Sequence, residues 1–247
     1  MFGLIGFAHK KNVKRTLENN FTKDEDYKIN VLPRETIRTG PDSEIIMLNT
    51  NTFKELFIIF IFLIIKLFFQ KFNYYKMIKN ISNFQNTSDY LPILNGVLIT
   101  DLIVIFLLNI GFINSKQLKI WYDKYNLSAV IADVLIIILG IIISRAIYPL
   151  IFDNYNIFYF ILLTVFIQVV HDILFYYAFW SIPRGKNKML DTFKDYANEV
   201  SYMAIISDSM MMISSILLST IFANVNLNTN LIVLLFSTYL VPYFIYK

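Results

Sequence analysis

The run NLSAVIADVLIIILGIIISRAIY, residues 126–148, is apolar except for Asp133, Arg145 and a few small polar side chains. A helix that crosses a bilayer needs roughly 20 largely apolar residues, so this run predicts a transmembrane helix. Similar runs occur on both sides of it, near residues 53–72, 91–113, 156–180, 199–223 and 229–246. We therefore predict an all-α transmembrane helix bundle with six spans. Lys66 interrupts the first run, which leaves five spans as the alternative.

The composition of the chain also indicates a membrane protein. Of its 247 residues, 56% are hydrophobic and 16% are charged, and the mean hydropathy is +0.54. An ordinary soluble domain carries about 25% charged residues. The absence of cysteine excludes disulfides, thiolate metal sites and cysteine nucleophiles. Two histidines are too few for a His-rich iron site, so we expect neither a metal nor a cofactor.

The charged residues divide the chain and orient it. Residues 1–52 are polar and are predicted to be a cytoplasmic N-terminal segment, either a solvated tail or one that touches the membrane. Residues 53–247 form the predicted transmembrane domain. With six spans, the basic loops 114–125 and 181–198 lie on the same side as both termini. Because basic loops stay in the cytoplasm, we predict that both termini are cytoplasmic.

A short amphipathic stretch precedes the fifth predicted span. In residues 186–200, apolar side chains recur at helical spacing, and charged side chains such as Lys188 and Asp191 lie between them. The pattern predicts a helix at the membrane interface, with a solvated loop as the alternative. Its apolar face consists of Met189, Leu190, Phe193 and Ala197.

Ionisable side chains inside the predicted spans are the candidate functional residues, because charge in a bilayer is costly. At 1.5 Å per residue, Asp133, Asp172 and Asp208 lie about 10–13 Å from the cytoplasmic ends of their helices, and Asp101 lies deeper, at about 18 Å. We predict a buried polar cluster that serves either to hold the helices together or to bind a proton or a cation. Its members are Asp101, Asp133, Gln168, His171, Asp172, Ser201, Asp208 and Ser209.

Three stretches carry a resemblance to a group of known proteins. They begin at Trp121-Tyr122-Asp123, at His171-Asp172-Ile173 and at Asp191-Thr192-Phe193, and they lie within residues 119–220. This part of the chain resembles multi-pass membrane proteins of unassigned function that are encoded by large DNA viruses of algae and protists. The resemblance implies a place in a virion membrane or a virus-modified host membrane, with virion membrane or capsid proteins as partners. It implies no activity.

The functional expectation follows from these observations. The sequence contains no GxSxG, HExxH, P-loop or GxGxxG motif, so we do not expect an enzyme. Its basic residues lie next to membrane spans, so the lipid bilayer is an expected partner and nucleic acid is not. We expect a structural component of a viral membrane. The alternative is a proton- or cation-conducting channel or transporter that uses the buried aspartates.

Overall fold

The computed structural model describes residues 79–246. The predicted N-terminal segment, residues 1–52, and the first predicted span, residues 53–72, lie outside these residues. The described part of the chain is helical and contains no β-strand, which confirms the all-α prediction.

Five of the described helices are long and apolar enough to cross a membrane. Their large side chains face outward in numbers that a soluble protein would not tolerate, as with Leu135 of the second and Leu235 of the fifth, which are 52% and 71% exposed. The chain is a multi-pass membrane protein. The five helices are α3 (Tyr90–Asn109), α5 (Leu127–Ile151), α6 (Ile157–Ser181), α8 (Met203–Phe222) and α9 (Leu227–Ile245).

Polar side chains and positive φ angles set the helix ends. The side-chain oxygen of Asn156 accepts hydrogen bonds from the first-turn amides of α6, and Asn226 does the same for α9. The predicted span 91–113 ends earlier, at Asn109, because the chain turns at Gly111 with φ of +79°. The predicted span 199–223 begins later, because Ser201, with φ of +52°, separates α8 from the preceding helix.

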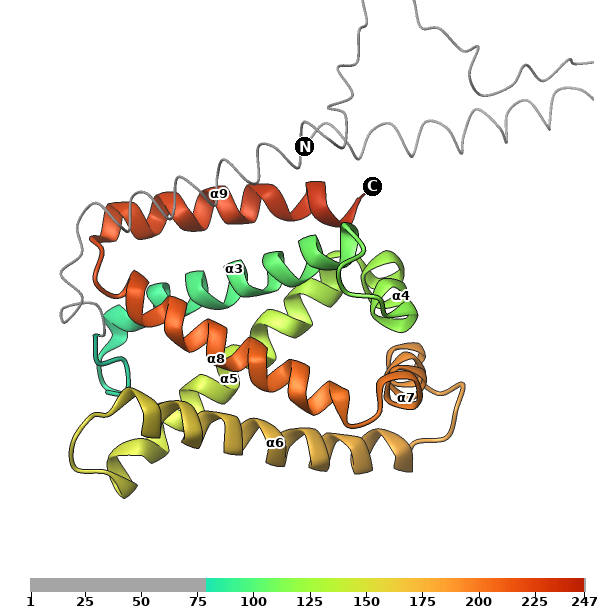
Figure 1. Ribbon diagram of the computed structural model, residues 1–247, viewed down its shortest axis with the longest axis horizontal. Helices are drawn as coiled ribbons and strands as arrows, with labels where there is room; N and C mark the ends of the chain where they lie inside the picture. Colours follow the sequence, from blue (N-terminus) through green and yellow to red (C-terminus); the bar gives the residue numbers. More distant parts are fainter. Residues whose placement is uncertain (1–78, 247) are drawn as a thin grey trace, which may run out of the picture. The chain divides into compact units, whose positions relative to one another are not determined.

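The five long helices form a bundle in which α3 is central (Figure 1). Helix α3 packs against α5, α8 and α9, and α6 packs against α5 and α8. The four helices α3, α5, α6 and α8 therefore form a closed ring, and α9 lies outside it against α3.

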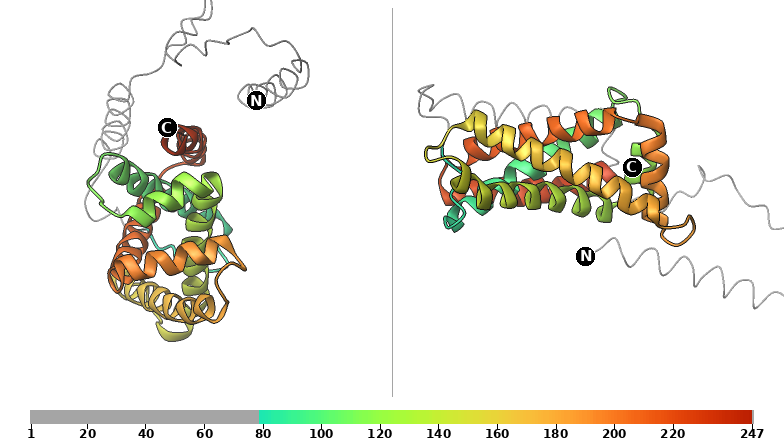
Figure 2. Two further views of the ribbon diagram at one scale, coloured as in Figure 1. Left: turned by 90° about the vertical axis from the view of Figure 1, so that its right-hand side faces the viewer. Right: turned by 90° about the horizontal axis from the view of Figure 1, so that it is seen from below.

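Two shorter helices, α4 (Lys116–Tyr125) and α7 (Lys188–Val200), lie across one end of the bundle, roughly perpendicular to the long helices (Figures 1 and 2). Helix α7 occupies the stretch predicted as an amphipathic helix, whereas α4 lies in a segment that we expected to be a loop. The carboxylate of Glu199, near the end of α7, accepts hydrogen bonds from the amides of Lys116 and Gln117 at the start of α4, at 2.8 and 2.9 Å. At the other end of α4, the hydroxyl of Tyr125 lies 2.9 Å from that of Thr192. The two helices therefore form a pair that covers this end.

The opposite end of the bundle is held by a buried ion pair. Arg145 of α5 and Asp89, just before α3, are both fully buried, and their nearest nitrogen and oxygen lie 3.5 Å apart. Arg145 also donates hydrogen bonds to the carbonyls of Asn83 and Asn86. The pair ties the segment that precedes α3 to the last turns of α5.

Candidate functional site

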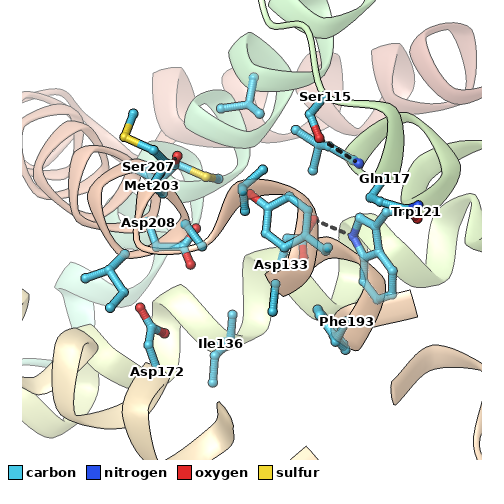
Figure 3. Close-up of a pocket in the computed structure, with 18 of the residues that line it drawn as sticks. Ser115, Gln117, Trp121, Asp133, Ile136, Asp172, Phe193, Met203, Ser207 and Asp208 are labelled. Carbon is cyan, nitrogen blue, oxygen red and sulfur yellow. Dashed lines mark hydrogen bonds between the residues drawn. The ribbon is translucent and has the colours of Figure 1, made fainter. Parts of the chain in front are cut away.

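A cavity of about 1220 Å³ lies inside the ring of long helices, at the end that α4 and α7 cover. All six of these helices contribute to its wall: α3, α4, α5, α6, α7 and α8. Most of the wall is apolar or aromatic. Figure 3 shows Trp121, Phe193, Ile136 and Met203 around the cavity.

Three carboxyl groups from three different helices line this cavity: Asp133 of α5, Asp172 of α6 and Asp208 of α8. In Figure 3 the carboxyl of Asp172 points toward that of Asp208, and Asp133 lies nearer to Trp121. Helices α5 and α8 begin at the end that α4 and α7 cover, and α6 ends there. The three aspartates are therefore at comparable depths on helices of opposite direction, as their positions in the sequence suggested.

Helix α4 supplies two hydrogen-bonding partners for Asp133. The indole Nε1 of Trp121 donates to Asp133 Oδ2 at 3.0 Å, and Tyr122 Oη lies 2.9 Å from the same oxygen. Tyr122 Oη also lies 3.0 Å from Oδ1 of Asp101 on α3. Tyr122 is 4% exposed, and burial, followed by the charges of Asp101 and Asp133, raises the pKa of its phenol well above the usual range.

The position of Asp101 differs from the prediction. We placed it about 18 Å from the cytoplasmic end by assuming that its helix continues to residue 113. Because α3 ends at Asn109, Asp101 lies eight residues, or about 12 Å, from that end. This depth matches that of the other acids, and it lets Tyr122 join Asp101 to Asp133. Asp101 is fully buried and does not line the cavity.

The two remaining acids have different surroundings. Asp172 Oδ1 accepts a hydrogen bond from Gln168 Nε2 at 2.6 Å and lies 3.3 Å from His171 Nδ1. The imidazole of His171 stacks on Phe175, with ring centres 5.7 Å apart. Asp208 makes no hydrogen bond or ion pair with any described residue. Burial, and after it the charge of Asp208, raises the pKa of Tyr196 on α7.

The two serines of the predicted cluster differ in position: Ser201 lines the cavity with the three acids, and Ser209 does not. Ser201 is exposed at the turn between α7 and α8, and its amide donates to the carbonyl of Ala197. The hydroxyl of Ser209 donates to the carbonyl of Ile205 in its own helix, and Ser209 does not line the cavity.

The apolar face of α7 packs on the bundle. The ring of Phe193 lies 4.8 Å from that of Trp121 and 5.3 Å from that of Phe175, measured between ring centres. Ala197 lines the cavity, whereas Met189 and Leu190 are partly exposed and do not. Helix α7 therefore covers part of the cavity, and its first turn lies outside the cavity wall.

The site has an excess of acidic groups. Within the described residues, no lysine or arginine nitrogen lies within 4.0 Å of Asp101, Asp133, Asp172 or Asp208. His171 is the one base beside them in the described part, and its side chain is 38% exposed. The described residues also contain no group of three His, Asp or Glu side chains that could hold one metal ion. The arrangement thus places carboxyl groups from three helices in a cavity with a largely apolar and aromatic wall.

Sequence reasoning missed Trp121, Tyr122 and Tyr196 as parts of the site. The first two belong to the polar run KQLKIWYDKY, whose hydropathy indicates a loop. The available signal was amphipathic spacing, because Leu118, Trp121 and Tyr122 share one face of a helix over these residues.

Comparisons with protein-family models, curated proteins and solved structures found no match for this chain. The resemblance to membrane proteins of large DNA viruses stays a prediction, as do the viral partners that it implies.

Proposed function

We propose that this protein is a membrane carrier for cations and that the acidic cavity is its binding site. One observation carries the proposal: carboxyl groups from three helices face a single cavity, and no lysine or arginine of the described residues neutralises them. Uncompensated acids in a transmembrane bundle are costly and are typical of ion and substrate pathways. A structural role for the cluster would require only hydrogen bonds between helices, yet Asp208 has no such bond to any described residue.

The cavity favours an organic cation over a bare metal ion. A directly bound metal ion needs several oxygen or nitrogen ligands close together, and no such group exists among the described residues. The volume of about 1220 Å³ exceeds the range of about 300–1,000 Å³ that is typical of sites for drug-sized molecules, so the cavity has room for an organic cation. Rings such as Trp121, Phe175 and Tyr196 can pack against an apolar body and attract its charge.

The closed half of the bundle favours a carrier over an open channel. Tyr202 and Met203 line the cavity and are 69% and 48% exposed, so the cavity opens to the surface near the start of α8. Deeper in the bundle, Ile141, Met212 and Ile216 are completely buried. Release of a bound cation on the opposite side of the membrane would therefore require a rearrangement of the helices.

Binding of ethidium, a planar aromatic cation, to the purified protein tests this proposal. We expect saturable binding, weakened about tenfold or more by Asp133→Asn, Asp172→Asn or Asp208→Asn, because a desolvated charge pair contributes at least about 1.4 kcal/mol. Asp153→Asn is the control, since Asp153 is exposed in the loop after α5 and away from the cavity.

Uptake of ethidium into liposomes that contain the protein then separates a carrier from a binding protein. A purely structural membrane protein, as the viral resemblance implies, would neither bind nor transport the probe. Unchanged affinity in all three cavity variants would also contradict the proposal.

A further inference from the structure

Tyr122 links Asp101 to Asp133 through two oxygen–oxygen contacts. If both acids were ionised, only one hydrogen atom would be present for these two contacts. Tyr122 Oη lies 3.0 Å from Asp101 Oδ1 and 2.9 Å from Asp133 Oδ2, but a phenol has a single hydrogen to donate. Two ionised carboxylates can only accept. Both contacts can be hydrogen bonds only if one of the two carboxyl groups carries a proton.

The surroundings place that proton preferentially on Asp101. Asp133 Oδ2 already accepts the indole hydrogen of Trp121 at 3.0 Å, which favours the ionised form of Asp133. Asp101 is fully buried, and its Oδ2 has no hydrogen-bonding partner among the described residues. A neutral carboxyl tolerates such a site far better than an ion does.

No cation within the described residues could replace the proton. The titratable groups that surround this link are Tyr122 of α4, His171 and Asp172 of α6, Tyr196 of α7 and Asp208 of α8. Tyr122 belongs to the link itself, and three of the other four are acids or phenols, which carry no positive charge. The fourth, His171, contacts Asp172 rather than the link. Helix α9, which packs on α3, contributes only exposed tyrosines as ionisable groups.

We propose that Asp101, Tyr122 and Asp133 form a proton-binding site that releases its proton when a cation occupies the cavity. This proposal rests on the proposed function, because the cavity cation is what drives the release. A positive charge near Asp133 favours an additional negative charge on the link. One proton then leaves for each positive charge that binds, so the carrier exchanges a cation for a proton.

The proton has a defined route. The hydrogen on Asp101 Oδ1 moves to Tyr122 Oη as the hydrogen of Tyr122 moves to Asp133 Oδ2. Asp133 lines the cavity and passes a proton to water there. At the end Asp101 is ionised, Tyr122 is again a neutral phenol and Asp133 is again ionised. Chains of this kind, with acids joined by a hydroxyl, suit proton movement within membranes.

Infrared spectroscopy of the protein in liposomes tests the site, because the C=O stretch of a protonated carboxyl is separated from the bands of a carboxylate. At neutral pH without ethidium, the wild type should show a protonated-carboxyl band, and Asp101→Asn should lose the part of it that belongs to Asp101. Asp153→Asn, at an exposed position, should leave the band unchanged. An identical band in the wild type and Asp101→Asn overturns the proposal, whether or not ethidium binds.

Ethidium then tests the coupling. At saturation the wild type should lose the Asp101 band and release one proton into a weakly buffered solution. Asp101→Asn should bind ethidium and release one proton fewer. Tyr122→Phe should keep the band with and without ethidium, because the bridge that connects Asp101 to the cavity is missing. If the wild-type protein binds ethidium and its band does not change, the proposed exchange is wrong. If the wild-type protein does not bind ethidium, the proposed cation carrier is wrong, and the spectra without ethidium still decide whether the proton site exists.

Discussion

Arg145 and Asp89 illustrate how a single charged residue in a span is stabilised. Arg145 is completely buried, yet it donates to two backbone carbonyls, lies 3.5 Å from Asp89 and has the ring of Tyr90 at 4.7 Å from its guanidinium carbon. None of these partners lies on α5. Arg145 therefore has a structural role. The acids of the cavity differ from it, because no lysine or arginine of the described residues lies within 4.0 Å of them.

Replacement of Asp89 by Asn should destabilise the protein strongly. The change leaves the buried guanidinium of Arg145 without its counter-charge, and the loss of one partner of a buried pair costs about 3 kcal/mol or more. Thermal unfolding in detergent measures the effect. Asp153→Asn, an exposed acid at the same end of the bundle, should unfold within a degree or so of the wild type. Equal melting temperatures for the two variants would contradict a stabilising role for the pair.

Tyr122 should make the fold sensitive to alkaline pH. Burial first, and then the charges of Asp101 and Asp133, raise the pKa of Tyr122 in the folded protein. Its contribution to stability is therefore fully present below the unfolded value, about pH 10, and is lost as the pH rises through that value and beyond. Tyr122→Phe should be less stable near neutral pH by about 1 kcal/mol, through its lost hydrogen bonds. Its melting temperature should then fall less steeply as the pH rises above about 10.

Tyr202→Phe is the matched control for this alkaline effect. Tyr202 is 69% exposed, so the variant should follow the wild-type pH profile. A wild-type slope for Tyr122→Phe would show that Tyr122 does not titrate with unfolding.

The residue-level prediction of the site was limited by helix ends and by loops. The similar depths of Asp133, Asp172 and Asp208 follow from hydropathy and a rise of 1.5 Å per residue. The depth of Asp101 depends on where its helix stops, and Gly111 with its positive φ shortens that helix. Tyr122 lies in a polar segment, and its contact with two spans depends on how α4 folds back across the bundle. The pattern of a single sequence does not specify how α4 packs across the end of the bundle.

At the scale of helices, close contact between α3 and α8 depends on one glycine. A Cβ added at Gly96 would lie 2.7 Å from the amide nitrogen of Ser219 and 2.8 Å from the carbonyl oxygen of Ser215. Both atoms belong to the backbone, which can move only if the helices separate. Small residues permit this kind of close approach in membranes, where packing rather than the hydrophobic effect joins helices.

Gly96→Ala should therefore lower the stability of the bundle by about 1–3 kcal/mol, as expected for an overpacked interface. The control is Gly140→Ala on α5, where the nearest atom is the terminal methyl of Met212, at 2.9 Å. That methyl can rotate away, and alanine gains about 0.5–1 kcal/mol over glycine in a helix, so this variant should be neutral or slightly more stable. Chemical denaturation of both variants in the same detergent makes the comparison, and a reversed order would contradict the close contact.

The pairing of α4 with α7 should depend on Glu199. Its carboxylate caps the first two amides of α4, and such charge-assisted caps contribute about 1 kcal/mol. Glu199→Gln should accelerate hydrogen exchange at the amides of Lys116 and Gln117 without loss of the bundle. Asp195 lies on the same helix as Glu199 and pairs with Arg184 in the loop before that helix. Asp195→Asn should leave that exchange unchanged, because surface pairs contribute little. Equal exchange in both variants would mean that Glu199 does not hold α4 in place.

At the scale of the molecule, the described spans divide the charged residues unevenly between the two ends. The end with α4 and α7 carries most of the described basic residues: Lys116, Lys119, Lys124, Arg184, Lys186, Lys188 and Lys194. The other end carries Lys79 and the buried Arg145. Hydropathy alone was sufficient for the number and type of these spans, and the loops 114–125 and 181–198 lie at one end as the sequence predicted. The way in which their helices cover a cavity depends on tertiary contacts that hydropathy does not encode.

This asymmetry predicts the orientation of the protein and, with it, the side on which the cavity opens. Because basic loops remain in the cytoplasm, the end with α4 and α7 should face the cytoplasm.

Labelling of introduced cysteines tests this orientation. The chain contains no cysteine, so single cysteines can be introduced without background. A cysteine at Lys186 should react with an impermeant thiol reagent only from the cytoplasmic side, and one at Asn154, in the loop between α5 and α6, only from the other. A third cysteine, at Lys119 of α4, should react from the same side as the cysteine at Lys186. Labelling of positions 186 and 154 from the same side would contradict the arrangement of spans. The reverse orientation would place the mouth of the cavity on the side opposite the cytoplasm.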